Sequence, residues 1–173
     1  MNRGYRVIKP EDLRDNVFRL FDSDWALITA GTMKKWNTMT ASWGGLGVLW
    51  NKPVAFIFVR PTRYTWQFTE RAARFTLSFF PGQYRKALAF CGSHSGRDTD
   101  KAAATGLIPF APAPGCVSFR QARLILECRK LYLQDIDPKR FLDRRIVKMY
   151  PKLDFHRMYV GQITRVLSSG RKT

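Results

Sequence analysis

The run Val54–Val59 constrains the fold more than any other stretch of this chain. It holds six consecutive apolar residues, and Arg60 and Pro61 follow at once. A short, unbroken apolar run rich in β-branched residues is typical of a strand buried on both faces. Pro61 lacks the amide hydrogen that strand pairing needs, so we expect the strand to end there. Thr62 then suits the N-cap of a following helix.

Four side chains surround the start of that expected helix: Arg60, Thr62, Arg63 and Thr65. Backbone amides at a helix N-terminus bind anions, and arginine forms charge-assisted hydrogen bonds with phosphate oxygens. The segment therefore predicts a phosphate site at the junction of strand and helix.

Small hydroxyl side chains alternate upstream of this run, at Thr38, Thr40 and Ser42. In a strand over residues 38–43 they would share one face, because successive side chains point to opposite faces. Such a row is able to hydrogen-bond the polar edge of a ligand, and it is equally typical of an ordinary edge strand rich in Ser and Thr. Both interpretations stay open on the residues alone.

Three glycines follow, Gly44, Gly45 and Gly47, and they predict a bulge or a close approach of the backbone to a ligand. They match neither the Gly-Lys-Ser/Thr ending of a P-loop nor the G-x-G-x-x-G turn of a Rossmann fold. Nucleotide sites of those two kinds are therefore not expected.

A second polar stretch, Gly92–Lys101, is too hydrophilic for a core. Its glycines and serines suit a ligand-binding loop, and a solvated surface turn is the alternative. Asp98 is expected to cap a helix over residues 99–105, with Gly106 just past its end. Cys91, immediately before the stretch, is interpreted as a small buried helix residue rather than a reactive thiol.

The remaining chain is predicted to hold short strands and short helices. We expect a helix that begins near Pro10 and reaches Phe21, and another over residues 83–90. We expect further strands over residues 25–30, 75–79, 117–120, 123–133 and 158–167, with 117–120 antiparallel to 123–133 and a kink at Gly161.

Length and composition favour a globular protein with one domain over residues 1–173. No apolar run approaches the length of a membrane span and the N-terminus lacks the apolar region of a secretory signal, so we expect no membrane partner. The three cysteines form no CxxC pair, which indicates a reducing cytoplasm and neither a disulfide framework nor a metal site.

The formal net charge of +17 raises nucleic acid as a partner. The basic residues, however, form scattered pairs rather than a block, and no nucleic-acid-binding motif is present. We therefore interpret the charge as mostly solvated surface with a local share that attracts phosphates. The pairs are Lys34-Lys35, Arg85-Lys86, Arg129-Lys130, Lys139-Arg140, Arg144-Arg145 and Arg171-Lys172.

Taken in order, these segments resemble the flavin reductase-like family of FMN-binding split barrels, in particular its flavoredoxin-type branch. The resemblance extends over nearly the whole chain. It rests on Trp25–Gly31, Asn37–Gly47, Asn51–Pro53, Phe58–Thr65, Phe75–Phe80, Phe90–Asp98, Asp100-Lys101, Asp154–His156 and Met158–Gly161.

The resemblance implies a mainly β (α+β) fold, a split β-barrel of antiparallel strands with short flanking helices. It also implies an FMN-dependent oxidoreductase that takes electrons from NADH, NADPH or a protein donor and passes them to flavin, oxygen or a protein acceptor. Flavin carries the redox chemistry in such proteins, and the protein supplies binding and orientation. An FMN electron carrier without turnover of its own is the alternative, and a basic β-barrel that binds nucleic acid is a third.

The resemblance further implies a homodimer with FMN near the interface, and it assigns the site. His156 stands before the last strand and is a candidate proton donor, although a lone histidine is more often structural. The tryptophans Trp36, Trp43, Trp50 and Trp66 pack in the core, line the interface or stack on the flavin. The expected FMN contacts are Thr38, Met39, Thr40, Ala41, Ser42, Trp43, Arg60, Arg63, Thr65, Ser93, Ser95, Arg97 and Lys101.

Overall fold

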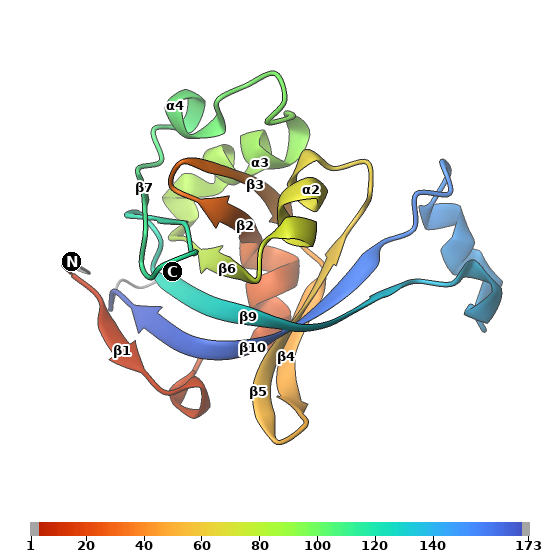
Figure 1. Cartoon of the computed structure of the whole chain (residues 1–173), viewed down its shortest axis with the longest axis horizontal. Coiled ribbons are helices and arrows are strands. Elements are labelled where there is room, and N and C mark those ends of the chain that lie inside the picture. Colours follow the sequence, from red (N-terminus) through yellow and green to blue (C-terminus); the bar gives the residue numbers. More distant parts are fainter. Residues whose placement is uncertain (1–3, 171–173) are drawn as a thin grey trace.

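The computed structural model describes residues 4–170, so the basic pair Arg171-Lys172 lies outside the described residues. One antiparallel sheet dominates the chain, with strand order β3-β2-β6-β9-β10-β5-β4 and β1 paired to β10 (Figure 1). Its strands are β1 (Arg6–Ile8), β2 (Ala26–Thr32), β3 (Lys35–Ala41), β4 (Gly44–Leu49), β5 (Lys52–Val59), β6 (Arg74–Phe79), β9 (Leu124–Asp135) and β10 (Arg157–Ser168). The strands β7 (Pro109–Phe110) and β8 (Ser118–Phe119) pair with each other.

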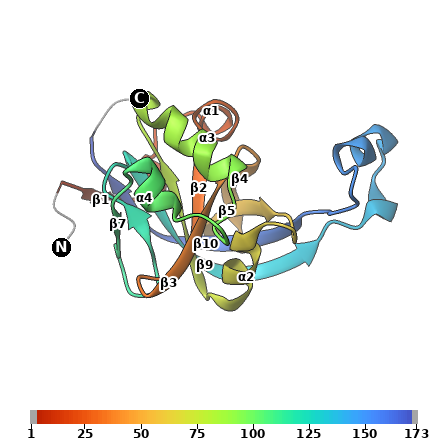
Figure 2. The ribbon, with the colours of Figure 1, turned by 90° about the horizontal axis from the view of Figure 1, so that it is seen from above.

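The helices are short and lie around this sheet (Figures 1 and 2). Four segments are α-helical, and the first of them is a single turn: α1 (Val17–Arg19), α2 (Tyr64–Arg71), α3 (Arg85–Ser93) and α4 (Lys101–Thr105). A π-helical turn covers η2 (Leu20–Asp24), and 3-10 turns cover η1 (Pro10–Asp12), η3 (Gly82–Tyr84), η4 (Pro138–Arg140) and η5 (Arg144–Met149). The mainly β architecture with short helices, expected from the sequence, is confirmed.

The sheet is not closed, because its two end strands β3 and β4 do not pair with each other. These strands are consecutive in the chain, and just Ser42 and Trp43 connect them. The barrel is therefore split at the place where the sequence puts its hydroxyl and glycine residues. An edge strand leaves backbone amides and carbonyls without a strand partner, so the split offers hydrogen-bonding groups to a ligand.

Two apolar clusters hold the sheet. The first lies on one face of the sheet and includes Ile28, Leu77 and Leu126. The second lies between the outer face and α3, and it includes Leu27 and Ile125. Alternating residues of the central strands thus enter opposite clusters, as the period of a strand dictates.

β6 is buried on both faces although its sequence alternates between apolar and hydroxyl residues. The Thr76 hydroxyl donates to the Val117 carbonyl at 2.6 Å, and the hydroxyls of Ser78 and Ser118 lie 2.8 Å apart. The segment around β8 therefore covers the polar face of β6 and satisfies its hydroxyls, since buried polar groups need partners. The expected pairing of residues 117–120 with 123–133 is wrong, because β8 pairs with β7 and β9 with β6 and β10.

Two predicted helix caps are also wrong. α2 begins after Arg63, and the Thr62 hydroxyl donates to Asp154 instead of capping the helix. α4 is capped by Asp100, whose carboxylate accepts from two backbone amides, rather than by Asp98. The predicted position of Gly106 past the end of α4 is confirmed, at a positive φ of 68°.

The N-terminal helix expected from Pro10 to Phe21 is broken into η1, α1 and η2, with Asn16 as the cap of α1. Phe21 is buried against β4, where a Cβ on Gly44 would lie 2.4 Å from its ring. The glycine at this position therefore serves a close approach of the core rather than of a ligand. Cys91 is buried as predicted, and burial raises the pKa of its thiol to about 11.

The ends of β9 and β10 reach beyond the body of the sheet and carry residues 136–156 away from it, a segment that we call the arm (Figures 1 and 2). The pairing of β9 and β10 shifts register between Val160 and Gly161, which confirms the predicted kink. A Cβ on Gly161 would lie 2.5 Å from the Phe75 ring, so the glycine is needed there. Among the described residues, no helix is both long and apolar enough to cross a membrane.

Candidate functional site

Three neighbouring cavities follow β3 from the split to the far end of the strand. The split cavity, of about 290 Å³, is lined by residues 39–43 together with Phe58, Arg60, Arg63 and His156. The loop cavity, of about 130 Å³, shares Met39 and Arg63 with it. The outer cavity, of about 480 Å³, shares Asn37, Tyr64, Gly96, Arg97 and Lys101 with the loop cavity. The three volumes together fall in the range of cofactor pockets, about 300–1,000 Å³.

Aromatic rings form one side of the split cavity. The ring centroids of Trp43 and His156 are 5.2 Å apart, and Phe58 meets His156 edge-on at 6.4 Å. Trp43 is 42% exposed, so it is accessible to a stacking partner. Such a wall suits a planar ligand.

His156 is buried, and its Nδ1 lies 2.8 Å from the Tyr150 hydroxyl in hydrogen-bond contact. Burial and then the charge of Arg60 lower the pKa of His156 to about 4. The imidazole is therefore neutral at neutral pH. Its expected role as a proton donor would need a proton taken from Tyr150 or from a ligand.

Arg60 holds the base of the arm against the sheet. Its Nη1 forms an ion pair with Asp154 Oδ1 at 3.0 Å, and its Nη2 donates to the Met149 carbonyl at 3.0 Å. Burial opposes ionisation of Asp154, but hydrogen bonds from Thr62 and Arg60 lower the pKa of its carboxyl below the usual range. The charge of Arg60 is thus already paired, which leaves it less free for a phosphate than the sequence suggested.

A buried hydrogen bond forms the floor of the loop cavity. The Asn37 amide donates to the Thr65 hydroxyl at 2.8 Å, and both residues are buried. Gly96 crosses this pair so closely that an added Cβ would lie 1.9 Å from Asn37 Oδ1. The polypeptide of the loop thus reaches Asn37 because residue 96 has no side chain.

Three cations, Arg63, Arg97 and Lys101, surround the loop cavity. Lys101 is 6% exposed, and its Nζ donates to the Thr38 and Cys91 carbonyls, each at 2.8 Å, while burial lowers its pKa. Arg63 donates to the Gly92 carbonyl at 3.1 Å, and none of the ion pairs formed within residues 4–170 involves any of these cations. Cations without a carboxylate partner around a small polar cavity fit a phosphate group.

Most of the residues predicted from the sequence meet at these cavities. Met39, Thr40, Ala41, Ser42, Trp43, Arg60 and Arg63 line the split cavity, and Thr65, Ser93, Ser95, Arg97 and Lys101 line the loop cavity. The Ser93 hydroxyl donates to the Ala89 carbonyl at 3.0 Å, and the Ser95 hydroxyl accepts from the Arg97 amide at 3.2 Å. The Ser93 hydroxyl is thus used within the last turn of α3, and the Ser95 hydroxyl within the loop that follows.

The three hydroxyl residues Thr38, Thr40 and Ser42 do not all line these cavities. Thr38 lines neither cavity, because its hydroxyl is buried and lies 2.8 Å from the Thr29 hydroxyl. The Thr40 hydroxyl donates to the Leu88 carbonyl of α3. Asn37 and Met39, on the other face, line the loop cavity. Thr38, which the sequence predicts as a contact, thus lies away from these cavities, and Asn37 of the same strand lines the loop cavity.

Sequence reasoning missed Asn37, Phe58, Tyr64 and Gly96, which line these cavities. Asn37 could have been found as a polar amide at the start of a strand whose neighbouring residues predict burial. The signal for Gly96 is its place in the polar loop, although its close approach to Asn37 follows from the fold alone.

Comparison with solved structures supports the architecture. The FMN-binding protein of Thermus thermophilus with bound 1-cyclohex-2-enone matches with a TM-score of 0.67 and 22% identity, over 95% of this chain and 80% of that one. Flavoredoxin of Methanosarcina acetivorans matches with a TM-score of 0.64 and 21% identity, over 93% and 76%. Nitrilotriacetate monooxygenase component B of Mycobacterium thermoresistibile matches with a TM-score of 0.67 and 13% identity, over 87% and 71%.

At these identities the structures establish the fold, which is that of the FMN-binding split barrels. No curated protein matches the chain. The family model described as flavin reductase like domain matches residues 18–172. The chain therefore belongs to the flavin reductase-like family.

Proposed function

We propose that the protein is an FMN-dependent oxidoreductase of the flavin reductase and flavoredoxin type. One observation carries the proposal: a small cavity is lined by three cations that have no carboxylate partner among the described residues, and it shares Met39 and Arg63 with a larger cavity that has an aromatic wall at the split of the barrel. A flavin mononucleotide has a phosphate at one end and a planar ring at the other, so its two ends match the two cavities.

The loop cavity would hold the phosphate. The guanidinium groups of Arg63 and Arg97 supply charge-assisted donors, and Lys101 adds positive charge from a fixed position. Thr65 and Ser95 add hydroxyls. Because the cations lack carboxylate partners in the described residues, no internal ion pair is broken when an anion binds.

The split cavity would hold the flavin ring, which supplies the redox chemistry when bound. The chain from Met39 to Trp43 forms the cavity side at the unpaired edge of the sheet, where backbone groups are free to bond a polar ring edge. Arg60, paired with Asp154, fixes the opposite side. Neutral, buried His156 would line the cavity without adding charge to it.

We propose NADH or NADPH as the reductant, with flavin, oxygen or a protein as acceptor. The cavity wall at Trp43 is exposed, which leaves room for a second planar molecule beside the flavin. A protein donor would need the same exposed edge. The buried, free cysteines Cys91, Cys116 and Cys128 support a reducing cytoplasm as the compartment.

Two measurements test the proposal. The absorption spectrum of the purified protein, with and without added FMN, should show flavin bands that survive gel filtration. Steady-state oxidation of NADH or NADPH should then depend on bound flavin. A protein that retains no flavin would refute the site, and one that binds FMN without any NADH or NADPH turnover would be an electron carrier instead.

We also propose that the protein is a homodimer with the flavin site near the interface. Within the described residues, the arm leaves several apolar side chains exposed: Leu142 at 100%, Leu153 at 69%, Met149 and Ile146. Its base contacts the split cavity through Asp154 and Arg60. A second copy packed on the arm would bury these side chains and come close to the site.

Sedimentation tests this assembly. Wild-type protein should sediment as a dimer, and Leu142→Asp with Leu153→Asp should shift it toward the monomer, because charges are costly in an apolar interface. Val48→Asp, at a similarly exposed apolar position on β4, tests whether the effect belongs to the arm. A wild-type monomer at micromolar concentration would refute the proposal.

A further inference from the structure

Tyr150 of the arm is buried beside the split cavity without lining it. Its ring packs against Phe155, with the centroids 4.7 Å apart, and the Arg60 guanidinium lies 4.9 Å from the ring centroid. Arg60 also bonds to Met149 and Asp154, which stand on either side of Tyr150 in the chain. The phenol is therefore held in a fixed position by packing and by the fold of the arm.

The direction of the hydrogen bond between Tyr150 and His156 follows from its surroundings. The hydroxyl and Nδ1 are 2.8 Å apart, and the hydroxyl has no other hydrogen-bond partner within residues 4–170. If Nδ1 carried the hydrogen and donated it, the buried phenol hydrogen would have no acceptor, which is costly. Burial raises the pKa of Tyr150, so the phenol keeps its proton. The hydroxyl therefore donates and Nδ1 accepts.

This direction fixes where the imidazole carries its own hydrogen. A neutral imidazole has one N–H, and with Nδ1 as the acceptor it stands on Nε2. Within residues 4–170, Nε2 forms no hydrogen bond, and it is not buried, because the one buried side-chain atom without a partner there is Arg123 Nε. Since His156 lines the split cavity, this N–H is available to a ligand in it.

The lining of the split cavity indicates what the N–H would meet. Among the described residues no carboxylate lines this cavity, and the side formed by Arg60, Arg63 and His156 presents hydrogen-bond donors. Trp43 lies next to His156, with the ring centroids 5.2 Å apart. A planar ligand against Trp43 would therefore place an acceptor at His156, and a carbonyl oxygen on the edge of a heteroaromatic ring is such an acceptor.

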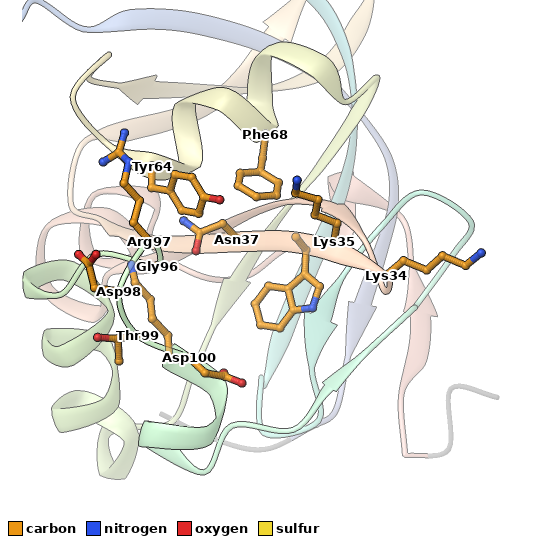
Figure 3. A pocket seen from close by; sticks show the side chains of 12 residues that line it. Lys34, Lys35, Asn37, Tyr64, Phe68, Gly96, Arg97, Asp98, Thr99 and Asp100 are labelled. Carbon is orange, nitrogen blue, oxygen red and sulfur yellow. The ribbon is translucent and has the colours of Figure 1, made fainter.

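We propose that Tyr150 is a positioning residue that holds His156 as the Nε2–H tautomer, so that the imidazole donates to a carbonyl oxygen of a planar ligand in the split cavity. The inference rests on the proposed function, because it takes that ligand to be the flavin ring or the nicotinamide beside it. Tyr150 lines none of the three cavities, so it acts through His156. The outer cavity plays no part, since α2, the start of β3 and the loop before α4 line it and it shares no residue with the split cavity (Figure 3).

Nitrogen-15 NMR of the flavin-free, full-length protein reads the tautomer directly. His94→Gln leaves His156 as the one histidine and assigns its signals. Near neutral pH the wild type should show a bare Nδ1 and a protonated Nε2, whereas Tyr150→Phe should show shifts averaged between the two tautomers. Tyr159→Phe, which removes another buried hydroxyl bonded to a side chain, is the matched control and should leave the His156 pattern unchanged. A protonated Nδ1 in the wild type, or the wild-type pattern in Tyr150→Phe, would overturn the inference.

Binding and turnover show whether a ligand uses the N–H. If the carbonyl belongs to the flavin, Tyr150→Phe should weaken FMN binding about 2- to 10-fold, and if it belongs to the nicotinamide, the same variant should raise the KM for NADH by that factor. Gln in place of His156 keeps an N–H donor but has no tautomers. In His156→Gln, the added Tyr150→Phe change should therefore alter both quantities by less than about twofold.

Two further outcomes separate this inference from the proposed function. If Tyr150→Phe in the otherwise wild-type protein changed neither the FMN affinity nor the KM for NADH, the donor role would be overturned while the proposed function stands. A wild-type protein that binds no FMN would refute the proposed function and the ligand named here, whereas the tautomer of His156 would still decide the role of Tyr150.

Discussion

Replacing Gly96 by alanine should weaken FMN binding more than any equally small change elsewhere in the chain. The added Cβ would lie 1.9 Å from Asn37 Oδ1 and 2.8 Å from its Cγ, both far below van der Waals contact. Asn37 is not free to withdraw, because it is buried and donates to Thr65 at 2.8 Å. Either this hydrogen bond breaks or the loop that carries Ser95 and Arg97 moves away from the cavity.

The expected loss of FMN affinity follows from the hydrogen bond between Asn37 and Thr65. A broken buried hydrogen bond that leaves a polar group without a partner costs about 1–3 kcal/mol. If that cost falls on the binding-competent state, the Kd for FMN rises about 5- to 150-fold. If the loop moves instead, the phosphate loses the donors of Ser95 and Arg97, and the loss of affinity is of the same order.

Fluorescence titration with FMN measures the change, and urea unfolding separates the two responses. Breakage of the hydrogen bond lowers the free energy of unfolding, whereas movement of the loop leaves it nearly unchanged. Gly82→Ala is the matched control, since a Cβ there meets nothing within 4 Å. Binding of FMN by Gly96→Ala within twofold of wild type would refute the placement of the phosphate in the loop cavity.

Three further predictions follow from the same structure. Lys101→Met leaves two buried carbonyls without a donor and should lower the free energy of unfolding by about 2–4 kcal/mol in urea, whereas Lys52→Met should have little effect; equal stabilities would contradict the buried ammonium. Because the pKa of His156 is lowered in the folded state, the unfolded chain binds a proton at this residue at a higher pH than the folded chain does. The free energy of unfolding should therefore fall by up to about 3 kcal/mol as the pH drops from 6.5 to about 4. His156→Asn should flatten this pH dependence. The same variant with unchanged flavin turnover would remove the residue as a proton donor. Gly44→Ala drives a Cβ to 2.4 Å from a core phenylalanine ring and should cost about 1–3 kcal/mol by thermal unfolding, while Gly45→Ala, with 4.0 Å to its nearest neighbour, should be tolerated; similar melting temperatures would contradict the packing.

The strands were predictable where apolar pattern and burial agree. The run Val54–Val59 forms most of β5, and the alternation of Phe75, Leu77 and Phe79 places these residues in the core as expected. Local pattern was a weaker guide to the caps. Thr62 and Asp98 have the right side chains for an N-cap, but Thr62 bonds to Asp154, distant in sequence, and helix α4 begins two residues later, after Asp100.

The site was predicted as a set of segments but not as a geometry. The alternation in β3 showed that Thr38 and Thr40 share a face. It could not show that this face lies against β2 and α3, where the two hydroxyls form hydrogen bonds with Thr29 and with the Leu88 carbonyl. That choice depends on which edge of the sheet stays open, which is set by the order of all the strands. The pairing of Arg60 with Asp154 depends in the same way on the fold of the arm.

The affinity of the protein for FMN compared with riboflavin tests the central claim most directly. The two ligands share the ring and the ribityl chain, and they differ in the phosphate alone. With Arg63, Arg97 and Lys101 around the loop cavity, FMN should bind at least about 100-fold more tightly, because each charge-assisted hydrogen bond contributes about 1.5–3 kcal/mol. Equal affinities, or a preference for FMN that Arg63→Gln and Arg97→Gln leave unchanged, would contradict a phosphate site in the loop cavity.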